Sequence, residues 1–229
     1  MNNTYTEKVH SIKQFSATKE QIKTYTEQVR KGQIKCNQPP CRRCNTSSSA
    51  FNRHEARKRQ FYIISENIVE IILGLLIRWK CSGCGKTLTD YPDFALPYKR
   101  YTVPTIERYS SLYTEDDQAS YRKVIITNSI GYPDSEQQLN HTTVHRWITS
   151  LGSYGKFLRT AQGLYLQAKP ESNICRELAG LSIPPKKYFT EDRKGILQRC
   201  RQLLRIETKF DSFLKVSIFP KLATQSGFI

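Results

Sequence analysis

The sequence predicts an α+β fold, and three of its features favour this class. Two Cys-x-x-Cys pairs, Cys41–Cys44 and Cys81–Cys84, enclose a stretch rich in β-branched and aromatic residues. Such residues pack well on a pleated sheet, so this stretch is typical of a β-hairpin. Most of the remaining chain places apolar residues at helical spacing. We therefore expect a ribbon of strands, with a helix before it and helices after it.

The charge of the chain favours a polyanionic partner. The 229 residues include 36 Lys and Arg against 20 Asp and Glu, which gives a formal net charge of +16. The excess lies in residues 30–101 and 151–229, whereas residues 102–150 have four basic and six acidic residues. Nucleic acid is the commonest polyanion in a cell. The alternative, that the cations only keep the surface soluble, stays open.

A membrane helix and a secretion signal are not expected. The longest apolar stretch, Ile68–Ile77, has ten residues and contains Glu70, whereas a membrane helix needs about 20. Residues 1–14 lack the apolar core of a secretion signal. We therefore expect a cytoplasmic protein, in which seven cysteines are better interpreted as metal ligands or buried thiols than as disulfides.

Residues 1–35 are expected to contribute an N-terminal docking helix. Ile22, Tyr25 and Val29 lie at helical spacing within Lys19–Arg30, and Gly32 follows as a stop signal.

Residues 36–101 are expected to form a Cys₄ zinc β-ribbon. Two residues between cysteines allow a tight turn to point both thiolates at one ion, and two such turns complete a tetrahedral site for Zn²⁺. The predicted ligands are Cys41, Cys44, Cys81 and Cys84. Gly83 and Gly85 strengthen the second turn, because glycine permits a left-handed backbone. A site that only holds the fold together is the alternative to one that also contacts nucleic acid.

Other candidate ligands fit this site less well. Cys36 has a longer spacer to Cys41, stiffened by Pro39 and Pro40. We expect His54 to lie on the surface or to face phosphate. Cys175 and Cys200 have no partner at metal-binding spacing, so we expect both to be buried thiols.

The ribbon is expected to be a projecting hairpin with strands at residues 57–64 and 68–80, followed by a Pro-rich and aromatic connector up to Tyr101. Its cations are candidates for contacts with backbone phosphate. They are Arg57, Lys58, Arg59, Arg78 and Lys80.

Residues 102–152 are expected to form a helix-turn-helix-like domain of three helices. Thr102 caps the first helix, Asp116 or Asp117 caps a second that ends near Thr127, and residues 128–139 form a loop. The third helix begins at Asn140 and ends at Gly152, with Trp147 on its buried side.

The third helix is the candidate for entry into the major groove of DNA. Its groove-facing candidates are His141, Thr142, Thr143, His145 and Arg146. The acidic balance of this segment and the long loop argue against DNA contact, so a plain helical domain stays open.

Residues 153–229 are expected to form a basic helical region. Its elements are a helix at Ser153–Ala168 and a longer helix capped by Thr190, in which apolar residues recur every three or four positions. This longer helix could contact the DNA backbone, form a dimer, or present a solvated surface over a core stripe.

Several motifs together resemble a known bacterial arrangement. Besides the two cysteine pairs they are Pro92–Phe94, Leu96–Tyr101, Ser120–Arg122 and Thr143–Trp147. In this order they resemble the zinc-ribbon plus helix-turn-helix leader of bacterial insertion-sequence transposases, and stand-alone bacterial proteins of unassigned function that share it. The resemblance covers about residues 36–152 and implies DNA binding, zinc in the ribbon and association with the bacterial nucleoid.

The chain departs from full transposases after this leader. Only 77 residues follow Gly152, and their carboxylates lie within helical patterns rather than at strand ends, where a two-metal nuclease needs them. We therefore expect a transposase-related, non-enzymatic, zinc-dependent protein that binds duplex DNA and can form a homodimer. The alternatives are the DNA-binding subunit of a split or truncated transposase and a zinc-stabilised adaptor that binds RNA or protein.

Overall fold

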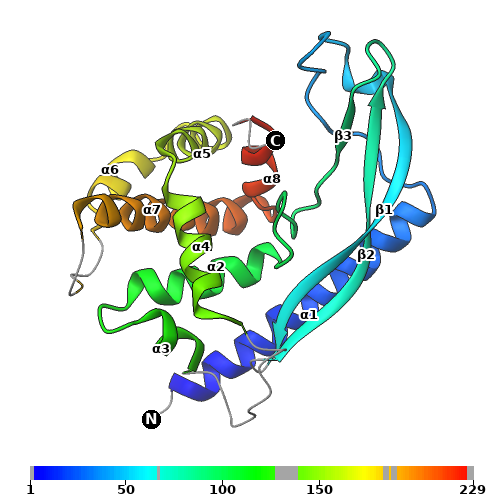
Figure 1. Cartoon of the computed structure of the whole chain (residues 1–229). Coiled ribbons are helices and arrows are strands. Elements are labelled where there is room, and N and C mark those ends of the chain that lie inside the picture. Colours follow the sequence, from blue (N-terminus) through cyan, green and yellow to red (C-terminus); the bar gives the residue numbers. More distant parts are fainter. Residues whose placement is uncertain (1–2, 66–67, 127–138, 183–185, 187–189, 226–229) are drawn as a thin grey trace.

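The computed structural model describes residues 3–65, 68–126, 139–182, 186 and 190–225 and has the expected α+β fold (Figure 1). A long antiparallel hairpin with helix α1 beside it joins a group of helices. The elements are α1 (Asn3–Arg30), a short 3₁₀ turn (Ser48–Ala50), β1 (Phe51–Ser65), β2 (Ile68–Cys81), β3 (Thr87–Thr89), α2 (Val103–Glu115), α3 (Tyr121–Ile126), α4 (His141–Gly152), α5 (Gly155–Ala168), α6 (Ile174–Ala179), α7 (Glu191–Leu214) and α8 (Phe219–Gln225).

Helix α1 packs along the hairpin, as the apolar spacing of residues 19–30 predicts. Ile22 and Val29 are fully buried against the strands. The close approach depends on Gly74 of β2, because a Cβ atom there would lie 3.1 Å from Thr26 Oγ1 of α1 and 2.8 Å from the ring of Phe61 of β1. Thr26 of α1 also accepts a hydrogen bond of 3.3 Å from the backbone N–H of Leu75. The helix begins at Asn3, well before the predicted start.

The turn end of the hairpin is fastened to the helical group, which corrects the expectation that it projects. Ile64 of β1 is buried in the same apolar core as helices α2, α4 and α7. The backbone of Tyr62 donates to Arg100 O (2.8 Å) and accepts from Thr102 N–H (3.1 Å). Figure 1 shows that the opposite end, which carries the cysteines, is the one that extends away from the helices.

The three predicted helices of residues 102–152 are present as α2, α3 and α4. Thr102 precedes α2 as predicted, whereas α4 begins one residue after the predicted Asn140, which caps it by accepting from Thr142 N–H. The cap of α3 is Ser120, whose Oγ accepts from Lys123 N–H, and not Asp116 or Asp117. Asp116 instead accepts from Gln118 N–H within the preceding turn. The predicted loop at 128–139 lies outside the described residues except for Leu139, which is buried.

Helix α7 runs through the helical group and is capped by Thr190 as predicted. It packs most extensively against α4. Strand β3 and helices α6 and α8 were not predicted, and all three are short. Among the described residues, no helix has both the length and the apolar character that crossing a membrane requires.

Gly152 should be intolerant of any side chain, because a Cβ atom there would collide with the backbone carbonyl of Ile196 where α4 meets α7. We expect Gly152→Ala to lower the free energy of unfolding by about 1–3 kcal/mol through this overpacking. Thermal unfolding checks the expectation, with Gly163→Ala as the matched control, because nothing lies within 4 Å of a Cβ at Gly163 of α5. Equal melting temperatures of the two variants would contradict it.

Candidate metal centre

Two backbone turns of the same design hold the four cysteines; each is called a knuckle below. In the first knuckle, Cys41 N–H donates to Thr46 O (2.9 Å) and Asn45 N–H donates to Cys41 O (2.7 Å). In the second, Cys81 N–H donates to Lys86 O (2.9 Å) and Gly85 N–H donates to Cys81 O (3.0 Å). The equal spacing of the two cysteine pairs therefore produces equal backbone geometry, with each first cysteine at the base of its turn.

Each knuckle contains a left-handed residue directly after its second cysteine. Gly85 has φ 72°, as predicted, and Asn45 occupies the corresponding place with φ 57°. Asn is the residue other than glycine that most readily adopts this conformation. Gly83 serves another purpose than the predicted one: a Cβ there would lie 2.5 Å from Thr46 Oγ1 and 3.3 Å from Cys44 Sγ. Its missing side chain lets the two knuckles meet.

The four cysteine sulfurs come together as predicted and could hold one metal ion. Their Sγ atoms all lie within 4.8 Å of one another, with Cys41 and Cys84 at 3.5 Å and Cys44 and Cys81 at 3.4 Å. A tetrahedron with Zn–S bonds of about 2.3 Å has edges of about 3.8 Å. The spacing therefore fits a tetrahedral four-thiolate site.

The surroundings of the thiols favour their ionised form in part. Backbone N–H groups of Arg43 and Cys44 lower the pKa of Cys41, and the hydroxyl of Thr46 lowers that of Cys44. For Cys84 the N–H of Lys86 acts in the same direction, but burial and the neighbouring thiols outweigh it and raise the pKa to about 11. A bound divalent cation would remove this repulsion, because it ionises its thiol ligands.

An apolar base supports the knuckles. Cys41 and Cys81 are buried in one cluster with Val29 of α1 and Trp79 of β2. The indole N–H of Trp79 donates to Asp90 Oδ2 at 3.2 Å. Cys44, by contrast, is exposed. The site thus lies at the surface of the molecule, and buried residues of α1, β1 and β2 support it from below.

The remaining cysteines lie outside the cluster. Cys36 packs beside the apolar base, where burial raises its pKa, and is not among the gathered sulfurs. Cys200 is buried as predicted, which raises its pKa to about 12. The prediction for Cys175 is wrong: it is exposed, because α6 is a single short helix with only Ile174 and Leu178 facing the core.

The predicted ribbon cations divide into exposed and internally bound groups. Arg57, Lys58 and Lys80 are exposed, as is His54. Arg59 is half-buried, stacks on Phe61 and Tyr91, and donates to the carbonyls of Leu96 and Lys99. Burial lowers the pKa of Arg59.

Arg78 is also bound within the protein. It donates to Glu55 Oε1 at 2.7 Å and to the hydroxyl of Thr87. Arg59 and Arg78 therefore fasten the hairpin to the connector and to β3, respectively, and neither guanidinium is free for a phosphate.

The predicted groove-facing residues lie on the outer half of α4. Thr142, His145 and Arg146 are exposed, and His141 and Thr143 are half-buried. Val144, Trp147 and Ile148 are buried, as the predicted stripe requires.

His145 touches a neighbouring helix. Its ring meets the edge of Tyr121 of α3, with centroids 5.2 Å apart. Burial, Arg193 and Arg146 lower the pKa of His145, which favours the neutral form of its imidazole. At this position it offers one hydrogen-bond donor and one acceptor instead of a charge.

Two cations that were not predicted from the sequence flank α4. Lys99 of the connector donates from Nζ to Ser150 Oγ at 2.9 Å, and Arg193 of α7 donates from Nη1 to Thr149 Oγ1 at 2.8 Å. Both come from segments far from α4 in the sequence, so no local pattern signals them. They place positive charge beside a helix whose own segment is acidic.

Of the comparisons with known proteins, only the comparison with family models gives a match. Neither the search of curated proteins nor the search of solved structures found a match. Residues 41–147 match a family model described as a domain of unknown function, DUF6431. The matched stretch begins at the first cysteine of the metal centre and ends at Trp147, a buried residue of α4.

Proposed function

We propose that this protein is a transposase-related, non-enzymatic, zinc-dependent DNA-binding protein. In this proposal α2–α4 act as a helix-turn-helix whose α4 contacts bases of duplex DNA, while the cysteine-bearing ribbon anchors the phosphate backbone. The observation that carries it is the outer face of α4, where Thr142, His145 and Arg146 are exposed and cations from two other segments lie alongside.

The side chains on α4 suit contact with base edges. The major groove is wide enough for one α-helix. An arginine can donate two hydrogen bonds to guanine. A threonine hydroxyl can hydrogen-bond to a base edge, and its methyl group can contact the thymine methyl group. A neutral histidine such as His145 can donate to or accept from either purine. The three exposed side chains are therefore chemically able to distinguish base pairs.

Two cations beside α4 partly offset the acidic balance of its segment. The segment 102–150 is acidic overall, which would repel phosphate. Lys99 and Arg193, however, are bound to hydroxyls on α4 itself. One cation therefore lies beside Ser150 and another beside Thr149. Phosphate groups next to α4 would meet this positive charge.

The metal has a structural part in this proposal. Zn²⁺ on Cys41, Cys44, Cys81 and Cys84 would hold the ends of β1 and β2 together, and thereby orient the exposed Arg57, Lys58 and Lys80 towards the DNA backbone. The same proposal places the protein in the bacterial cytoplasm, associated with the nucleoid.

Replacement of His145 and Arg146 by Ala tests base contact. Zinc-loaded protein is used to select duplexes from a random pool, and we expect an enriched motif with the unaltered chain. The double variant should lose roughly tenfold or more of its preference for that motif, since one good base contact contributes about 1–3 kcal/mol of discrimination. Its melting temperature should change little, because both side chains are exposed and His145 loses only its edge contact with Tyr121.

Arg159→Ala with Gln167→Ala on α5 is the control, because both side chains are exposed on another helix and one charge is again removed. This control should keep the motif. A motif that survives in the His145/Arg146 variant would contradict the assignment of α4.

A further inference from the structure

We propose that the cations around the knuckles form a separate site for the phosphate backbone of duplex DNA, which the metal ion assembles and which carries no base preference. The inference rests on the proposed function, whose backbone contact by Lys58 and Lys80 it extends to the cations of both knuckles and of the turn after α1. The site is named the metal-end patch below. It is defined by Lys31, Lys35, Arg42, Arg43, Arg53, Lys58, Lys80 and Lys86.

The metal-end patch has almost no carboxylates around it, and the negative charge at its centre is that of the four thiolates in excess of the metal ion. Residues 31–58 and 80–86 contain nine Lys or Arg and a single carboxylate, Glu55. That carboxylate is taken by Arg57 and Arg78, at 2.5 and 2.7 Å. The nearby Asp90 is half-buried and accepts hydrogen bonds from Gln38 and Trp79. No carboxylate in these segments is left to balance the patch.

Every cation of the metal-end patch is available to a partner. All eight side chains are exposed. Within the described part of the chain none of them forms an ion pair. This separates the patch from Arg59 and Arg78, whose guanidinium groups are bound inside the protein. Exposed cations without partners on one end of a molecule are what a polyphosphate backbone requires.

The metal centre brings these cations together from distant parts of the chain. Arg42 and Arg43 lie inside the first knuckle, while Lys80 precedes the second knuckle and Lys86 ends it. The knuckles themselves touch at Gly83 and Thr46. The charges would repel one another if the knuckles were free, so the four thiolates and their cation hold the patch in place. Binding of phosphate then relieves the remaining repulsion.

Arg53 extends the patch to the end of α1. Its Nη1 lies 3.5 Å from where a Cβ of Gly32 would stand, so the guanidinium covers the turn that follows α1. Lys31 and Lys35 flank this turn in the sequence. The patch thus continues from the knuckles to α1.

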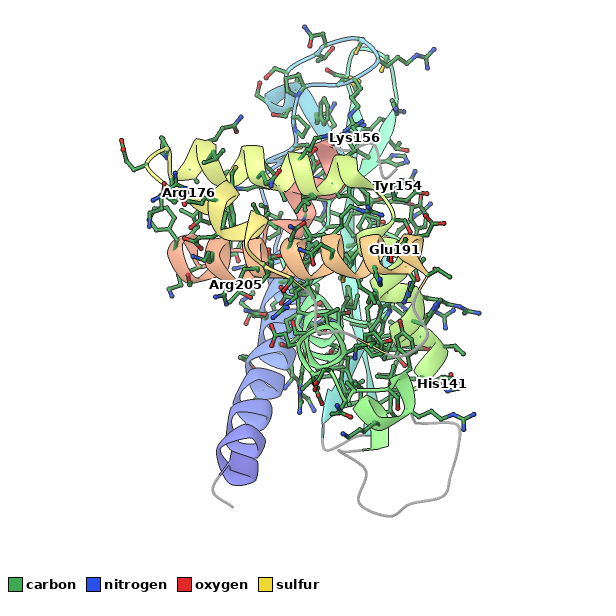
Figure 2. The ribbon with its side chains drawn as sticks, turned by 90° about the vertical axis from the view of Figure 1, so that its left-hand side faces the viewer. His141, Tyr154, Lys156, Arg176, Glu191 and Arg205 are labelled. Atoms are coloured by element: carbon green, nitrogen blue, oxygen red, sulfur yellow. The ribbon has the colours of Figure 1, made fainter. Side chains whose placement is uncertain are left out.

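The metal-end patch lies apart from α4. Figure 1 shows the knuckles at the far end of the hairpin, away from the helical group that contains α4. Lys156, Arg176 and Arg205, labelled in Figure 2, lie on helices α5, α6 and α7 of that group and are also exposed. They provide a matched control, since two arginines and one lysine can be removed at either place.

The test compares two triple variants in binding to random-sequence duplex DNA over a salt series. Arg42→Ala, Arg43→Ala and Lys86→Ala together should weaken binding to all duplexes alike and reduce the slope of log affinity against log salt by about two to three, since each lost phosphate contact removes about 0.9. The selected motif should stay the same. Lys156→Ala, Arg176→Ala and Arg205→Ala should leave the slope nearly unchanged.

Several results would overturn the proposal. An equal reduction of the salt slope in both triple variants would mean that only total charge matters. An unchanged slope in the Arg42/Arg43/Lys86 variant would mean that the patch does not contact phosphate. Zinc content and melting temperature report whether the knuckles stay folded. If the Arg42/Arg43/Lys86 variant loses zinc or melts at a lower temperature, a third triple variant replaces it: Lys35→Ala, Arg53→Ala and Lys80→Ala. These three residues lie outside the knuckles, and their removal must reproduce the reduced salt slope.

The two proposals fail in different ways. If α4 does not contact bases, the unaltered chain selects no motif, yet the salt slope still responds to the metal-end patch. If the patch does not contact DNA, the motif is selected and the slope stays as it was. Single-stranded RNA in the same salt series separates partners: tighter binding to RNA than to the duplex would overturn the choice of duplex DNA.

Discussion

Cys81→Ser is expected to abolish metal binding and unfold the cysteine-bearing end of the hairpin. Cys81 is the last residue of β2, it is buried, and its sulfur lies 3.4 Å from that of Cys44. A serine hydroxyl is a poor ligand for Zn²⁺, so only three thiolates would remain where a tetrahedral site needs four. Structural Zn²⁺ contributes its binding free energy to folding. The loss should therefore amount to several kcal/mol.

Zinc content and thermal unfolding measure this effect. The variant should contain almost no zinc and should melt at a lower temperature. Cys36→Ser is the matched control, since Cys36 is half-buried near the same apolar base but lies outside the group of gathered sulfurs. Full zinc content and an unchanged melting temperature in Cys81→Ser would refute a structural metal site.

Features that depend on neighbouring residues were predictable from the sequence. A Cys-x-x-Cys turn is closed by its own backbone, so the knuckle at Cys81 and the left-handed residue Gly85 follow from a few adjacent positions. The cap at Thr190 is local in the same sense, because its hydroxyl accepts from Arg193 N–H three residues later. The buried stripe of α4 likewise follows from helical spacing.

Features set by contacts between distant segments were not predictable. Arg59 and Lys58 are adjacent in one basic run, yet Arg59 points to the connector carbonyls while Lys58 points to solvent. Alternation along a strand assigns them to opposite faces, but only the position of the connector decides which face is covered. The left-handed conformation of Asn45 was not predicted for a different reason, because no glycine marks this position in the sequence.

A buried carboxylate between α7 and α8 should make the protein less stable as the pH rises. Glu207 is buried in α7, and its Oε2 accepts from Ile218 N–H at 2.8 Å. Burial raises the pKa of Glu207 to about 7, with Asp211 acting in the same direction. Burial and the charges of Glu207 and Asp211 also raise the pKa of Glu107 of α2 well above its usual range. The folded protein therefore holds protons that the unfolded chain has released.

The direction of the pH effect follows from this difference in proton binding. Below the unfolded pKa of about 4.5 both states are protonated, and the stabilisation is fully present. As the pH rises to about 7, the unfolded state gains from ionisation while folded Glu207 does not, so the free energy of unfolding should fall by on the order of 3 kcal/mol. Above that pH this group causes no further loss.

Glu207→Gln should remove the part of this dependence that Glu207 causes, because an amide oxygen can still accept from Ile218 N–H but does not ionise. Urea unfolding at a series of pH values should give a flatter curve for the variant, which becomes the more stable protein at mildly alkaline pH. Glu115→Gln, at an exposed position of α2, should follow the unaltered chain. Parallel curves for Glu207→Gln and the unaltered chain would mean that Glu207 is already ionised in the folded protein. The buried position of this carboxylate between two helices would then have to be stabilised by a cation.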